Sequence, residues 1–88
     1  MMLMKKIDPK RYNLSSRLNL QQNKLNEIFI IIDRKSRVVM KDAHRILETV
    51  NRIQSIEKDR YVSVLTSAPV CSKTRTFLSD NAISVKNF

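Results

Sequence analysis

Glycine is absent from this 88-residue chain, and cysteine and histidine occur only once each. Loops that cradle phosphates or dinucleotides need residues that accept positive φ and let the backbone come close to the ligand, which glycine does best. The lack of glycine therefore argues against P-loop and Rossmann-type nucleotide binding. We expect no nucleotide cofactor.

The lone cysteine, Cys71, cannot form an internal disulfide and suits a reducing compartment. The lone His44 and the scattered acidic residues give no cluster with zinc-ligand spacing, so we expect no structural zinc site. Only four apolar residues precede the first lysine, far fewer than a signal-peptide core or a membrane span of about 20 residues requires. We therefore expect a cytoplasmic protein with no membrane partner.

Positive charge dominates the composition. The net charge is +9, and residues 1–41 hold ten basic and three acidic residues, whereas residues 42–88 hold seven and five. The hydrophobic content of 42% is sufficient for folding, and a chain of this length allows one domain with a modest core. A folded domain with so much positive charge indicates an anionic partner, with the basic surface mainly in the N-terminal half.

The first part of the chain predicts a basic arm followed by a hairpin. Residues 1–12 are polar and basic without period, so we expect a flexible or extended arm, with one α/β domain over residues 13–88. Residues 14–22 alternate weakly as a strand would, although a short helix is also compatible. Two asparagines within residues 23–26 suit a turn, and residues 27–33, with Ile28–Ile32 in their middle, predict a central strand buried on both faces.

Helices and strands alternate after the central strand. Asp42 is a suitable N-cap for a long helix, whose apolar stripe is Ala43, Ile46, Leu47, Val50, Ile53 and Ile56. Residues 61–66 predict a second buried strand, a second helix should open at Ser67 or Ala68 and stop at Asn81, and residues 82–85 predict a last strand. The sequence thus predicts an α/β fold, a β-hairpin followed by β-α-β-α-β, with a small mixed sheet and two helices.

The segment Ile30 to Arg37, followed by Lys41, Asp42 and an amphipathic helix, resembles the core of the PD-(D/E)xK nuclease superfamily, the restriction-endonuclease-like fold. The resemblance covers roughly residues 14–85. It implies that Asp33 holds Mg²⁺ and that Lys35 positions or activates the attacking water, so that both are catalytic. An active metal-dependent nuclease using these two residues is one reading. The other is that they form only a solvated strand end.

Two departures from the family pattern suggest an incomplete site. The family places a second acid on the preceding strand, where this sequence has Asn19, and the family's N-terminal helix has no counterpart here. We therefore expect a degenerate or minimal relative that keeps the scaffold and a basic surface, without a cofactor unless the nuclease is active, when Mg²⁺ is needed.

Basic residues in and just after this segment, together with those on the N-terminal arm, are candidates for contacting the phosphate backbone of DNA or RNA. They are Lys5, Lys6, Lys10, Arg11, Arg34, Lys35, Arg37 and Lys41. Tyr12 is the lone aromatic residue among the N-terminal cations, so stacking on single strands is poorly supported. A merely solvated basic face, or a protein-interaction subunit such as a homodimer, is the alternative.

Cys71 lies in a predicted strand-loop-helix setting that looks like that of thioredoxin and glutaredoxin proteins, where a helix start can lower a thiol pKa. No second cysteine lies three residues on, so a buried core thiol is the favoured interpretation. His44 is assigned no role.

Overall fold

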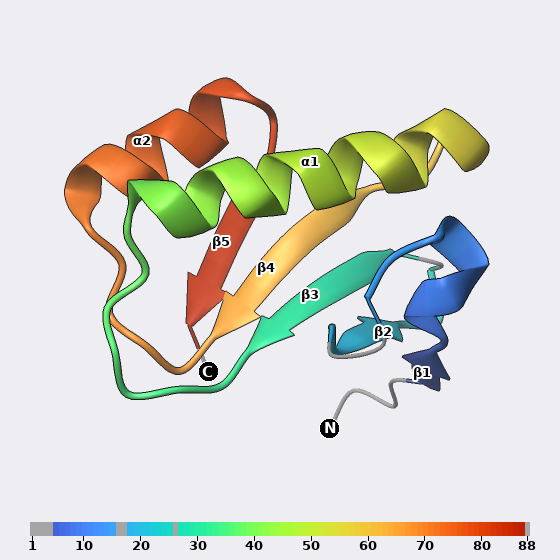
Figure 1. Ribbon diagram of the computed structural model, residues 1–88, viewed down its shortest axis with the longest axis horizontal. Helices are drawn as coiled ribbons and strands as arrows, with labels where there is room; N and C mark the ends of the chain where they lie inside the picture. The colour runs from blue at the N-terminus through green and yellow to red at the C-terminus, as the bar shows by residue number, and fades with distance from the viewer. Residues whose placement is uncertain (1–4, 16–17, 26, 88) are drawn as a thin grey trace.

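The computed structural model describes residues 5–15, 18–25 and 27–87 of the chain (Figure 1). In chain order its elements are β1 (Lys5–Ile7), the 3-10 helix η1 (Pro9–Tyr12), β2 (Leu20–Gln22), β3 (Ile28–Ile32), α1 (Met40–Ile56), β4 (Val62–Thr66), α2 (Ser72–Asp80) and β5 (Ser84–Asn87). Neither helix of the described chain is long and apolar enough to cross a membrane.

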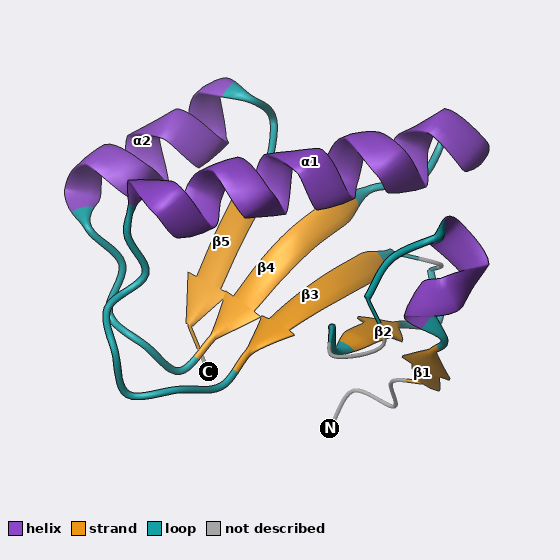
Figure 2. Ribbon diagram, viewed as in Figure 1, coloured by secondary structure: helices purple, strands orange, loops and turns teal. Residues whose placement is uncertain are grey.

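The strands form one mixed sheet in the order β1-β2-β3-β4-β5. The first three strands are antiparallel neighbours, whereas β3, β4 and β5 run parallel and are joined by α1 and α2. Both helices lie over the same face of the sheet (Figure 2). This arrangement confirms the predicted α/β fold. The edge strand β1 is an addition that the sequence pattern did not indicate.

The central strand is β3, as predicted from its run of β-branched and aromatic residues. Ile28 and Ile30 are buried in the core with the helices, and Phe29, on the opposite side of the pleat, is only 2% exposed. Ile31 and Ile32 are half-buried. Burial on both faces therefore holds for the first three residues and weakens toward the carboxyl end of the strand.

Helix α1 begins at Met40, two residues before the predicted N-cap. Asp42 still caps it, but from the third helical position, where its Oδ2 accepts a hydrogen bond from the Val39 amide at 3.0 Å. The predicted apolar stripe is buried at Ala43, Ile46, Val50 and Ile53. Ile56, the last residue of the helix, is 51% exposed because the stripe ends before it.

Helix α2 begins at Ser72 instead of Ser67 or Ala68. Residues 67–71 stay outside the helix because Val70 forms a parallel bridge with Val38 and the Pro69 carbonyl accepts a hydrogen bond from the Val38 amide. The left-handed residue after the helix is Ala82, at φ 60°, and not Asn81, whose φ is −101°. Strand β5 consequently starts at residue 84, two residues later than predicted.

Residues 5–12 do not form the expected flexible arm. Strand β1 pairs with β2, and η1 buries Tyr12 completely against the core. Asp8 caps η1 through the Lys10 amide, and Asn13 ends it in the left-handed region at φ 57°. The first four residues of that arm, and Asn26 of the predicted turn, lie outside the described residues. Of the predicted strand over residues 14–22, the described residues form a strand at Leu20–Gln22, and residues 16–17 lie outside the described part.

Candidate nucleic-acid interface

The loop between β3 and α1 contains four of the nine predicted site residues: Asp33, Arg34, Lys35 and Arg37. Asp33 to Arg37 directly follow the carboxyl end of β3 and are exposed to solvent. Asp33 Oδ1 accepts a hydrogen bond from Ser67 Oγ at 2.7 Å, which ties this loop to the loop after β4. The predicted residues therefore stand at the carboxyl ends of the parallel strands, where ligands of open α/β sheets usually bind.

Arg34 closes the loop instead of reaching outward. Its guanidinium donates to Asp42 Oδ2 at 2.6 Å, to the Ser36 carbonyl at 3.2 Å and to the Arg37 carbonyl at 3.3 Å. Burial raises the pKa of Asp42, but hydrogen bonds from Arg34 and from a backbone amide outweigh it and hold the pKa below its usual value. The predicted phosphate contact at Arg34 thus competes with a structural ion pair.

Three other predicted cations are exposed at this end of the sheet: Lys35, Arg37 and Lys41. We call them the basic rim. The bridge between Val38 and Val70, with hydrogen bonds to Pro69 and from the Cys71 amide, sets the two loops side by side. Lys35 and Arg37 therefore stand on a loop whose backbone is held in place, and Lys41 follows it in the first turn of α1.

The N-terminal cations lie elsewhere. Lys5 and Lys6 are on β1, and Lys10 and Arg11 are on η1, which contacts α1. Arg11 forms an ion pair with Glu57, the residue that follows α1, at 3.6 Å. Since Lys41 is in the first turn of that 17-residue helix, the two groups are separated by about 24 Å at 1.5 Å per residue. The eight predicted residues do not form one continuous patch.

Two arginines that the sequence reasoning overlooked lie between these groups. Arg45 and Arg52 are exposed on α1 and are spaced four and eleven residues from Lys41. At 3.6 residues per turn all three share one side of the helix, with Glu48 between them. The helical spacing of basic residues was the available signal for this stripe.

The Mg²⁺ site implied by the resemblance fits these residues poorly. In residues 5–15, 18–25 and 27–87, no three Asp, Glu, His or Cys side chains are placed to hold a metal ion. Asp33 and Asp42 are already bound to Ser67 and Arg34. Asn19 is paired beside Ile31, whose amide donates to its carbonyl at 2.9 Å, and not beside Asp33.

Cys71 is the N-cap residue of α2 and is half-buried, not enclosed in the core. The backbone amides of Lys73 and Thr74 at the start of α2, with smaller effects of the Thr74 hydroxyl and Arg37, hold the pKa of the Cys71 thiol below its usual value. His44 packs its ring against Phe77, with centroids 5.0 Å apart, and so helps to join the two helices.

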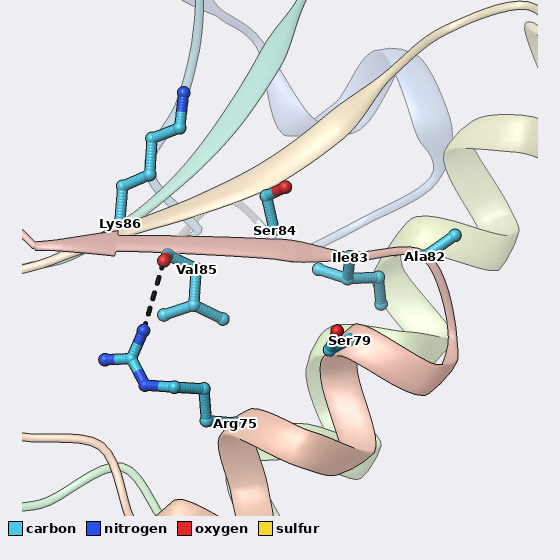
Figure 3. A pocket seen from close by; sticks show the side chains of 7 residues that line it. All are labelled: Arg75, Ser79, Ala82, Ile83, Ser84, Val85 and Lys86. Atoms are coloured by element: carbon cyan, nitrogen blue, oxygen red, sulfur yellow. Dashed lines mark hydrogen bonds between the residues drawn. The ribbon is translucent and has the colours of Figure 1, made fainter.

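A separate hollow of about 400 Å³ lies between α2 and the outer strand β5. Figure 3 shows Arg75 reaching from α2 to this strand, where it donates to the Val85 carbonyl at 3.3 Å. It also donates to Asn87 Oδ1 at 3.1 Å. Arg75 thus occupies an acceptor of an edge strand, which hinders pairing with another chain there.

No protein-family model matches the sequence, and no curated protein matches it. Solved structures do share its fold. An EndoMS structure in complex with double-stranded DNA aligns at a TM-score of 0.73 and 10% identity, over 97% of this chain and 36% of that chain. A repair endonuclease from Pyrococcus abyssi aligns at 0.64 and EndoMS in apo form at 0.66, each at 10% identity over 80% of this chain. The chain spans about a third of the length of these structures.

Proposed function

We propose that this chain binds nucleic acid, with double-stranded DNA as the favoured ligand, through the basic rim. The observation that carries the proposal is the position of Lys35, Arg37 and Lys41 at the carboxyl ends of β3 and β4. They stand on a fold shared with repair endonucleases, one of which was solved with double-stranded DNA.

Phosphate neutralisation supplies the affinity in this proposal. Each lysine or arginine that meets a phosphate releases condensed counterions, so binding weakens as salt rises. The exposed Arg45 and Arg52 extend the positive charge along α1 for a second set of contacts. The rim residues Lys35, Arg37 and Lys41 include no aromatic side chain for stacking, which favours the duplex backbone over splayed single strands.

We further propose that the chain is a degenerate member of the PD-(D/E)xK superfamily that does not cleave its ligand. Asp33 and Lys35 directly follow β3, but the Asp33 carboxylate accepts the Ser67 hydroxyl. The position beside Ile31, immediately before β2, is held by Asn19, which has no carboxylate. Phosphodiester cleavage with one or two metal ions requires carboxylates that orient the ion, and Asp33 alone is too small a ligand set for this.

Binding is tested with two charge-matched double variants. Lys35→Gln with Lys41→Gln removes two rim charges, whereas Lys10→Gln with Lys24→Gln removes two exposed charges away from the rim, on η1 and in the turn before β3. Fluorescence anisotropy of a mixed-sequence duplex across a salt series gives the slope of log K against log salt. The rim variant should lower this slope by about 1.8, at about 0.9 per lost contact, and the control should leave it unchanged. Equal slopes for the two variants, or no binding by the unaltered protein at low salt, would refute the proposal that nucleic acid binds at the basic rim.

Cleavage is tested by incubating plasmid with the protein and Mg²⁺ or Mn²⁺. The expected result is that the unaltered protein and the Lys35→Ala variant both leave the plasmid supercoiled. Nicking by the unaltered protein that Lys35→Ala abolishes would establish the active nuclease instead.

A further inference from the structure

Two of the most exposed large apolar side chains lie together at the end of the molecule opposite the basic rim. Leu25, in the turn between β2 and β3, and Tyr61, just before β4, are each 77% exposed. Both line one hollow of about 480 Å³ with residues 57–60. Large apolar side chains that share one exposed hollow indicate an interaction surface more strongly than single exposed ones do.

Hydrogen bonds hold the backbone that carries both side chains. The Tyr61 carbonyl accepts a hydrogen bond from the Ile28 amide at 2.8 Å, which fixes it beside the start of β3. Asn23 Oδ1 accepts from the Leu25 amide at 2.9 Å and from the Glu27 amide at 3.0 Å, which fixes the turn. A surface that is already ordered loses little conformational entropy when a partner covers it.

The charge around this hollow selects the partner. Its lining contains two acidic residues, Glu57 and Asp59, and two basic residues, Lys58 and Arg60, so its formal charge is zero. The whole chain carries +9, and two copies that approach through the basic rim repel each other. This repulsion is weaker at the neutral hollow than at the basic rim.

We propose that a second copy of the chain docks here, forming a two-fold symmetric dimer centred on Leu25 and Tyr61. Such an interface must be self-complementary, because the same patch serves both subunits. Lys58 and Asp59 are adjacent, exposed and opposite in charge. In the proposed dimer, Lys58 of one copy faces Asp59 of the second copy, and the two-fold axis repeats this pair. The basic rims then face outward at the two far ends.

The dimer is tested by analytical ultracentrifugation without nucleic acid, so the outcome does not depend on the proposed DNA binding. The mass should rise from 10.3 kDa toward twice that value between about 10 µM and about 1 mM protein. Leu25→Ser with Tyr61→Ser should raise the dimer dissociation constant about tenfold or more, since each change occurs twice in the interface. Val39→Ser, at an apolar residue 42% exposed at the start of α1, is the control and should leave the constant unchanged.

Charge reversal identifies the partner as a second copy. Lys58→Asp alone and Asp59→Lys alone should each give a monomer, because like charges then face each other across the axis. An equimolar mixture of the two variants should dimerise again, because every facing pair is then opposite in sign. A monomer at every concentration of the unaltered protein, a dimer indifferent to the Leu25 and Tyr61 changes, or a mixture that stays monomeric would each overturn the proposal.

Discussion

The Tyr12→Phe variant tests how the N-terminal segment is held against the rest of the fold. The hydroxyl of the fully buried Tyr12 donates a hydrogen bond to Glu57, which also meets Arg60 at 3.2 Å and Arg11 at 3.6 Å. The Tyr12 hydroxyl is the main cause that holds the pKa of Glu57 below its usual value. The variant removes one oxygen atom and keeps the ring in the core.

A hydrogen bond to a charged group contributes about 1.5 to 3 kcal/mol to stability, so the free energy of unfolding should fall by about that amount at pH 7. Because the pKa of Glu57 is lowered by folding, its contribution is complete above the ordinary value near 4.5 and is lost as pH falls through the folded-state pKa. The difference between variant and unaltered protein should therefore be smaller at about pH 3 than at pH 7, and should fall to about 1 kcal/mol or less once Glu57 is protonated in the folded state.

Urea denaturation at both pH values, followed by circular dichroism, measures these differences. Tyr61→Phe is the matched control, since Tyr61 is 77% exposed, and should change stability by less than about 0.5 kcal/mol. A Tyr12→Phe loss that is the same at pH 7 and pH 3 would show that the hydroxyl acts through something other than the Glu57 carboxylate.

Three further predictions concern single residues. Asp42→Ala removes the partner of Arg34 and a cap of α1, and should lower the free energy of unfolding by about 1 to 2 kcal/mol at pH 7 and less below about pH 3, by urea denaturation. The Cys71 thiol, whose pKa is lowered mainly by amides at the start of α2, should react with iodoacetamide at a lower pH than free cysteine, and Arg37→Ala should shift that profile upward. Ala82→Gly should stabilise the protein by about 0.5 to 1 kcal/mol in thermal unfolding, because φ is 60° at this position and glycine adopts positive φ without steric cost. An unchanged or lowered stability would contradict this prediction.

The sequence predicted those elements whose residues carry a strong period or composition. The isoleucine-rich run gave β3, and the stripe from Ala43 to Ile53 gave α1, because burial repeats at strand and helix spacing. Strand β1 was missed because three residues are too few to show alternation. The start of α2 was misplaced because Pro69 was interpreted as the first turn of a helix. The residues around it instead pair with Val38, which is distant in sequence, through the Pro69 carbonyl and the Val70 bridge.

Part of the candidate site was predicted from residues that lie close together in the sequence. Lys35, Arg37 and Lys41 are close in sequence and remain close in the fold. The N-terminal cations were grouped with them because they share a half of the chain, but the antiparallel pairing of β1 with β2 sends them toward the other end of α1. Sequence proximity predicted a shared surface only where no reversal of the chain intervened.

The bridge between Val38 and Val70 has a mechanical consequence. It fastens the two connections that leave β3 and β4, so neither can swing open alone. A substitution near Pro69 is therefore felt across the gap at the entry to α1, and a strain applied to one connection is shared by both. A residue inserted into one connection should therefore shift the register of the bridge to the other.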